Sequence, residues 1–262
     1  MRFREILDYL TSKWWFYLLL LIIGFFLLPP YSSVGYSYDE MGEVIAETLS
    51  NAIIYSLVDM IWPSLLIHII FILIIIAIIR GYQKAVLLFN VFCSIIYFMI
   101  AIGQGTGISG KYGLVIIIGN VFLILLVALT WVWECFVQRN KLGGEIRKDH
   151  LWLVPFAIFA FWSPPYPKLD LLYLLRYLGA GYFGVAYCLT TPVILTILLL
   201  YYPNINKPVL RLTAFIGLCF AIINVLSPIW SQFIFEVIWT GTILHIPLLV
   251  TCAYSLILSI KK

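Results

Sequence analysis

The chain has 262 residues, of which 63% are hydrophobic and only 11% are charged. Soluble domains carry about 25% charged residues, so a fold of this length could not hide so much apolar surface from water. The composition predicts an integral membrane protein and excludes a soluble enzyme, a nucleic-acid-binding protein, a disulfide-rich secreted domain and a disordered regulator. In a membrane protein, a net charge of +4 is explained by the basic loops that set its orientation, and it does not indicate a polyanionic partner.

Seven apolar segments have or approach the ~20 residues that a helix needs to cross a membrane. They cover residues 14–30, 61–79, 85–103, 113–137, 181–202, 209–228 and 241–260. An eighth segment, 151–163, is shorter and is followed by two prolines. If it also crosses, only Lys111, Lys168 and Arg176 of the basic residues fall on the outer side.

Basic residues concentrate in cytoplasmic loops, so this distribution favours about eight transmembrane helices with both termini in the cytoplasm. The fold class that we predict is an all-α, polytopic helical bundle in the cell membrane, with residues 1–262 forming a single membrane domain. The tripeptide PPY at 29–31 recurs at 164–166. This recurrence suggests a four-span unit used twice, in residues 1–137 and 149–262, as in some carriers.

Residues 39–52 predict a short amphipathic helix on the outer side. Ser37 and Glu40 have the spacing of a capping box, and Val44, Ile45 and Leu49 then share one helical face. The opposite face is acidic. It predicts either a lid that concentrates cations at an outer opening or simply a solvated surface.

Residues 105–112, GTGISGKY, match GxGxxG and resemble a phosphate-binding loop except at Tyr112. Such loops bind phosphate only between a strand and a helix. Here the segment is expected to join two membrane helices on the outer side, so we interpret it as a glycine-rich turn.

Ionisable and polar side chains inside spans are candidates for function because their burial in lipid is costly. His68 has Ser64 one turn away and is the strongest of them, either as a proton-carrying group or as a neutral histidine bonded between helices. The candidate solute or ion path comprises His68, Ser64, Asp59, Asn90, Ser94, Asn224 and Glu236. Glu134, at the inner end of a span, is expected to reach water, as are Asp59 and Glu236.

The segments GVAYCLTTPVIL, around Cys188, and INVLSPIW, which ends the seventh span, resemble parts of the exosortase/archaeosortase family of membrane transpeptidases. That family uses a cysteine, an arginine and a histidine near the outer membrane face. The resemblance implies catalytic roles for Cys188 and His245. Ser227 stands where the family's arginine belongs, which leaves Arg176 as the candidate for that role.

Three functions follow from these patterns. The first is a carrier, pore or permease-like subunit for a small solute or ion, and the second is a non-catalytic membrane subunit that anchors or assembles a complex. The third is an intramembrane enzyme of the exosortase type. The expected partners are the lipid bilayer, other membrane subunits or a separate cytosolic energising subunit, with no nucleic acid. The cysteines form no CxxC pair, so no metal or other cofactor is predicted.

Overall fold

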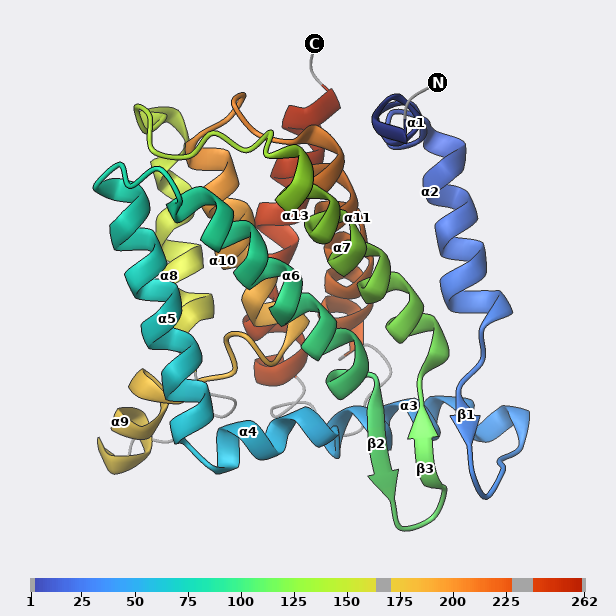
Figure 1. Ribbon diagram of the computed structural model, residues 1–262. Helices are drawn as coiled ribbons and strands as arrows, with labels where there is room; N and C mark the ends of the chain where they lie inside the picture. The colour runs from blue at the N-terminus through green and yellow to red at the C-terminus, as the bar shows by residue number, and fades with distance from the viewer. Residues whose placement is uncertain (1–2, 164–170, 228–237, 261–262) are drawn as a thin grey trace.

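A computed structural model describes residues 3–163, 171–227 and 238–260 as a helical bundle (Figure 1). The N-terminal helix and the end of the last helix lie at the same end of the bundle. The chain reversals around residues 80–84, 138–150 and 201–206, with most of the basic residues, lie at this end, which we call the basic end. The opposite end carries helix α3 and is called the α3 end.

Five helices in the described residues are long and apolar enough to cross a membrane. They are α5 (Trp62–Ile79), α6 (Ala85–Gln104), α7 (Ile118–Val137), α11 (Lys207–Leu226) and the stretch Thr240–Ile260, which includes α13 (Ile246–Ile260). These helices confirm the prediction of a membrane protein. Four of them begin within two residues of the predicted spans, because uninterrupted apolar runs leave few alternatives to a helix.

The first predicted span is shorter than expected. It consists of α2 (Trp14–Leu21) and a π-helical segment, Ile22–Leu27. The π-helical turn lies where the span meets α7, since a Cβ atom on Gly119 would lie 1.9 Å from the carbonyl oxygen of Gly24. Only glycine permits this close approach of the two backbones.

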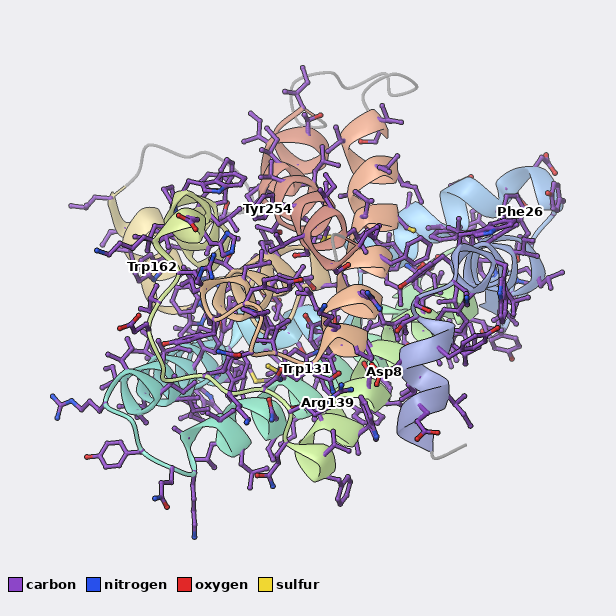
Figure 2. The ribbon with its side chains drawn as sticks, turned by 90° about the horizontal axis from the view of Figure 1, so that it is seen from above. Asp8, Phe26, Trp131, Arg139, Trp162 and Tyr254 are labelled. Carbon is purple, nitrogen blue, oxygen red and sulfur yellow. The ribbon has the colours of Figure 1, made fainter. Side chains whose placement is uncertain are left out.

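A further helix, α1 (Phe3–Leu10), precedes α2 and lies across its axis at the basic end (Figure 1). The sequence analysis missed α1, although Phe3, Ile6, Leu7 and Leu10 have the spacing of one helical face. Asp8 of α1 pairs with Arg139 beyond α7, with 3.0 Å between the guanidinium and the carboxylate (Figure 2). This ion pair ties α1 to the bundle.

The predicted amphipathic helix is confirmed. A 3-10 turn, Tyr38–Glu40, leads into α3 (Met41–Ser50), and Ser37 and Glu40 form the predicted capping box. A second 3-10 turn, Ile53–Tyr55, and α4 (Ser56–Asp59) connect α3 to α5. Together α3 and α4 run across the end of the bundle, beneath the ends of α5 and α6 (Figure 1).

The bundle is helical as predicted, but the α3 end also contains three short strands that the sequence did not predict, and they form an antiparallel sheet in the order β1-β3-β2. They are β1 (Tyr31–Ser32), β2 (Thr106–Ser109) and β3 (Gly113–Ile116). The glycine-rich turn is therefore the tip of a β-hairpin, and α7 begins at Ile118 rather than at Gly113. Val44 of α3 packs on Tyr112 and Val115 of this hairpin, which buries the apolar face of α3.

Two predicted segments are shorter in the structure. The segment 151–163 begins within a 3-10 helix, Lys148–Leu153, and its α-helical part is α8 (Val154–Trp162). The predicted span 181–202 contains α10 (Tyr187–Leu200), which starts late because Gly184 adopts a φ of +82° in the preceding loop. Between them, α9 (Leu171–Gly179) lies at the α3 end (Figure 1).

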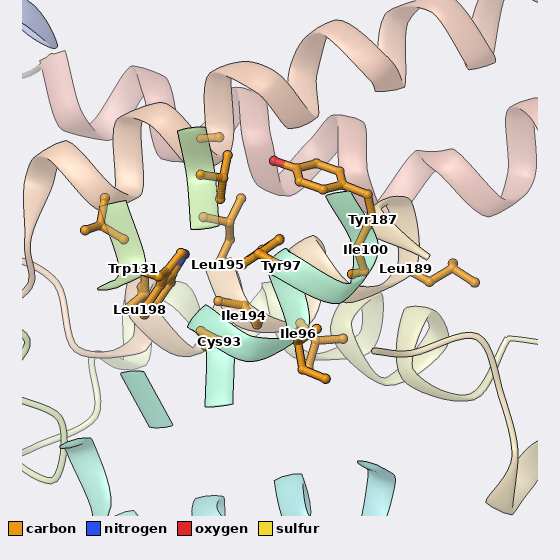
Figure 3. Close-up of a cluster of buried hydrophobic side chains, with 14 of the residues drawn as sticks. Cys93, Ile96, Tyr97, Ile100, Trp131, Tyr187, Leu189, Ile194, Leu195 and Leu198 are labelled. Atoms are coloured by element: carbon orange, nitrogen blue, oxygen red, sulfur yellow. The ribbon is translucent and has the colours of Figure 1, made fainter. Parts of the chain in front are cut away.

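The core lies where α6, α7, α10 and α11 meet (Figure 3). Tyr97 stacks near Trp131 with 6.4 Å between ring centroids, and its hydroxyl lies 3.1 Å from that of Thr191. The Tyr187 hydroxyl donates to the carbonyl oxygen of Thr213. These bonds satisfy polar groups that would otherwise be stranded in an apolar interior, and they fix the relative rotation of the helices around the site described next.

Candidate functional site

A pocket of about 160 Å³ lies at the α3 end of the bundle, with both polar and apolar lining. We call it the outer pocket, after the side of the membrane on which the sequence predicts the α3 end to lie. Its lining residues come from six separate parts of the chain and are Leu49, Tyr55, Gln104, Gly105, Asn120, Ile124, Tyr187, Cys188, Phe220, Asn224 and His245. No side chain among them is a carboxylate, a lysine or an arginine, so hydrogen bonding dominates its chemistry.

Gln104 shapes the pocket by joining three elements. Its side-chain oxygen accepts a hydrogen bond from the backbone N–H of Tyr187 (2.9 Å), at the first residue of α10. Its side-chain nitrogen donates to the hydroxyl of Tyr55 at 3.4 Å. An unsatisfied donor at the start of α10 is thereby paired, and α6, α10 and the segment after α3 are held around one cavity.

Asn120 and Asn224 line the pocket with amide side chains that have hydrogen-bonding capacity left for a bound solute. The side chain of Asn120 makes no hydrogen bond to another residue in the described part of the chain, and Asn120 is only partly exposed. Asn224 donates its side-chain N–H to the carbonyl oxygen of Phe220 within α11 (2.8 Å), and its side-chain oxygen keeps free accepting capacity. A bound solute could therefore both accept from and donate to this wall.

His245 and Cys188 complete the polar lining. The Nδ1 atom of His245 lies 2.9 Å from the carbonyl oxygen of Thr240. A carbonyl only accepts, so this contact assigns a proton to Nδ1, and in the neutral ring Nε2 is then the acceptor. Within the described residues, no hydrogen bond joins the Cys188 thiol to His245. Pro192 has no N–H, so the carbonyl of Cys188 lacks its usual helical donor.

The structure thus brings together three of the residues singled out from the sequence, Cys188, Asn224 and His245. Arg176 does not line the outer pocket. Its guanidinium lies 4.0 Å from the carboxylate of Asp59, which is 81% exposed. Glu236 lies outside the described residues.

His68 lies elsewhere, in a dry and aromatic environment. It is 2% exposed, and its ring contacts those of Phe161 and Phe183 at 4.7 and 5.5 Å between centroids. Nδ1 lies 2.8 Å from the carbonyl oxygen of Ser64, and Nε2 lies 3.3 Å from that of Phe161. The Ser64 hydroxyl donates instead to the carbonyl oxygen of Gly181 (2.6 Å). His68 therefore connects α5 to the end of α8.

A second polar cluster lies at the basic end, and it was not predicted from the sequence. Glu134 is fully buried, so the expectation that it reaches water is wrong. Its carboxylate accepts from the backbone N–H of Asn140 (2.6 Å) and from the side chain of Asn206 (2.5 Å). Asn140 also donates to the side-chain oxygen of Asn90 at 3.1 Å. Asn90 therefore belongs to this cluster, whereas Ser94 faces Cys135 at 3.9 Å.

The acidic face of α3 is tied to the hairpin by charge. The Lys111 ammonium lies 2.9 Å from Glu40 and 3.3 Å from Glu43. The Glu40 carboxylate also accepts the backbone N–H of Ser37 (2.9 Å). The Ser37 N–H, followed by Lys111 and the Ser37 hydroxyl, lowers the pKa of Glu40 to about 2. The acidic surface is therefore partly neutralised by the β2–β3 hairpin.

Gln104, Asn120, Tyr55 and Tyr187 were not predicted as site residues. Gln104 and Asn120 are amides at the ends of apolar runs, which is a signal that could have identified them. The tyrosines have no such signal, because tyrosine is common at both membrane interfaces. Within the described residues, no cluster of three histidine, cysteine or acidic side chains is placed to hold a metal ion.

The long apolar helices define the class of this protein, an integral membrane protein with a polar pocket near one end of its bundle. No protein-family model, curated protein or solved structure matches the chain. Its function is therefore inferred from the geometry of the site.

Proposed function

We propose that the chain crosses a cell membrane eight times, with both termini on the cytoplasmic side. The eight crossings are the span 14–27, the helices α5, α6, α7, α8, α10 and α11, and the stretch 240–260. The helix α8 is short, but the loop before it lies at the basic end and α9 after it lies at the α3 end (Figure 1). Basic residues mark the cytoplasmic side of short loops, and this rule supports a cytoplasmic basic end and an outward-facing α3 end.

We further propose that the protein is a carrier or permease-type subunit for a small, uncharged polar solute. One observation carries this proposal: amide, hydroxyl, thiol and imidazole groups from separate helices line one pocket at the outer end. Helices that converge on a few polar groups are the usual setting of a binding site in a bundle. A cavity of about 160 Å³ lies below the 300–1,000 Å³ typical of drug-sized ligands, which favours a small solute.

Binding to the purified full chain in detergent tests this proposal. The melting temperature is measured with a panel of small amides, polyols and amino-acid amides, each at millimolar concentration. At least one is expected to raise the melting temperature of the wild type and to lose this effect in Asn120→Leu and Asn224→Leu. Ser94→Ala, which faces Cys135 rather than the pocket, is the matched control. Equal stabilisation of all four chains would contradict the proposal.

A second candidate function is a thiol-dependent membrane enzyme, because Cys188 and His245 line the same pocket. In that function, Nε2 of His245 would take the thiol proton. The rate of alkylation of Cys188 by iodoacetamide separates the two functions. An activated thiol reacts rapidly at pH 7 and slows in His245→Ala, whereas a carrier predicts slow reaction that increases only at alkaline pH.

A carrier of this size also needs a source of energy if it concentrates its solute. We propose that a separate cytosolic subunit, or another membrane subunit, supplies it at the basic end. A chain that co-purifies with partner subunits but transports no solute would leave the anchoring function as the better description.

A further inference from the structure

We propose that a cavity at the basic end binds the phosphate headgroup of an anionic phospholipid. The cavity has a volume of about 510 Å³ and lies between the α1–α2 corner and the helices α11 and α13. Its lining residues are Thr11, Ser12, Trp14, Tyr17, Arg211, Leu256, Ser259 and Ile260. It is separate from the outer pocket and shares no residue with it.

Arg211 provides the positive charge of this cavity. One of its nitrogens donates to the carbonyl oxygen of Ser259 (2.7 Å), near the end of α13. A guanidinium has five N–H donors in a planar fork, so the bond to Ser259 orients the group and leaves further donors for a phosphate. Lys207 lies one helical turn away on α11, and Lys13 follows Ser12 at the corner.

The carboxylate of α1 nearest to the corner does not compete for Arg211. Asp8 is paired with Arg139 at 3.0 Å. The hydroxyls of Thr11 and Ser12 donate to the backbone of α1, at Leu7 and Tyr9, and the Tyr17 hydroxyl donates to the carbonyl oxygen of Thr11. The corner is thus a rigid frame in which Arg211 is the charged donor.

The remaining walls favour a lipid over a soluble anion. Trp14 and Ile260 are each 75% exposed, and both flank the cavity. A soluble phosphate would gain nothing from them, whereas the glycerol backbone and acyl chains of a phospholipid would cover them. Amphipathic helices such as α1 lie at the same depth as headgroups, and basic cavities between helices on the cytoplasmic side bind anionic headgroups.

Native mass spectrometry of the purified full chain, with dioleoyl phosphatidylglycerol or dioleoyl phosphatidylcholine added, tests this inference. The wild type is expected to bind phosphatidylglycerol more tightly by about five- to tenfold, which is the effect of one basic residue near a membrane surface. Arg211→Gln should reduce this preference to near unity, and Arg211→Lys should retain most of it. Arg147→Gln is the control, because it removes an exposed charge that pairs with Asp149.

A second variant guards against misfolding of Arg211→Gln. Ser12→Asp leaves Arg211 in place, adds a negative charge at an exposed position of the lining, and should abolish the preference as well. Inorganic phosphate is the third probe, and it should not raise the melting temperature at concentrations where the lipid does. The inference is overturned if Arg211→Gln and Ser12→Asp keep the preference, if Arg147→Gln loses it equally, or if phosphate alone reproduces the stabilisation.

Discussion

Glu134 is an acidic side chain that is fully buried in the helical bundle, and neutral groups donate hydrogen bonds to its carboxylate. The backbone of Asn140 and the side chain of Asn206 both donate to it. It therefore holds two chain reversals at the basic end, the one after α7 and the one before α11. Its role is structural, because the bonds it makes are local to these reversals.

Replacement of Glu134 by glutamine should destabilise the protein. The glutamine amide would place an N–H group against groups that already donate to this position. The loss of a hydrogen bond to a charged group lowers the free energy of unfolding by about 1.5–3 kcal/mol. Unfolding by a denaturing detergent measures this change. Glu145→Gln, at an exposed position in the same loop, is the control and should be neutral. Equal stability of the two variants would show that the cluster does not hold the reversals.

Glu40 has a pKa of about 2, lowered from an ordinary value of 4.5. A carboxyl whose pKa is lower in the folded state stabilises that state above pH 4.5, and this contribution is lost as the pH falls from about 4.5 to about 2. Lys111→Ala should raise the pKa of Glu40 only in part, because the Ser37 N–H is the first cause of the shift. Carboxyl ¹³C titration of glutamate-labelled protein between pH 2 and 6 measures it. A return to 4.5 in the variant would contradict this assignment.

The sequence identified individual polar residues within apolar runs but not which of them meet. Cys188, Asn224 and His245 converge on the outer pocket, while His68 and Asn90 face other neighbours. Whether these side chains meet depends on the rotation of each helix about its axis and on the residues at which it begins and ends. The late start of α10, for example, places the backbone N–H of Tyr187 against Gln104 and Cys188 in the pocket lining, and that start depends on the loop around Gly184.

At the scale of elements, His68 connects two helices of very different length. The ring contacts of His68 and its bond to the Phe161 carbonyl hold α8, a helix of nine residues, against α5. His68→Ala should therefore reduce the free energy of unfolding by about 1–3 kcal/mol, with solute binding per folded molecule unchanged. The matched comparison is Asn120→Leu, which should lose solute binding while its free energy of unfolding stays unchanged. Loss of solute binding in folded His68→Ala would restore this residue to the solute path.

Element boundaries were predictable where apolar runs were long and uninterrupted. The sheet was not, because β1, β2 and β3 have only two to four residues each. The residues of β1 are also 83 to 85 positions away in the chain from their partners in β3. The pairing of Tyr31 with Ile116 is a tertiary property that no local pattern reports. The proposed duplication of 1–137 and 149–262 remains a prediction, since the second PPY lies outside the described residues.

At the scale of the whole molecule, the proposed topology is tested by position-specific labelling. In a cysteine-free background, Lys207→Cys at the basic end should react with an impermeant maleimide only after the membrane is permeabilised. Lys111→Cys, whose parent side chain is 51% exposed at the hairpin, should react in intact cells. The reverse pattern would place the basic end outside, and labelling of both in intact cells would break the eight-crossing arrangement.

We propose that the outer pocket opens to the outside of the membrane. The reaction of Cys188, which lines this pocket, with an impermeant reagent tests this most directly. The chain keeps Cys188 alone, with alanine at the other four cysteines, and intact cells are treated with a small impermeant thiosulfonate. We expect Cys188 to react from outside, and much faster than Cys252 kept alone, since Cys252 is fully buried. Reaction only after permeabilisation, or at the rate of Cys252, would contradict an outward-facing pocket.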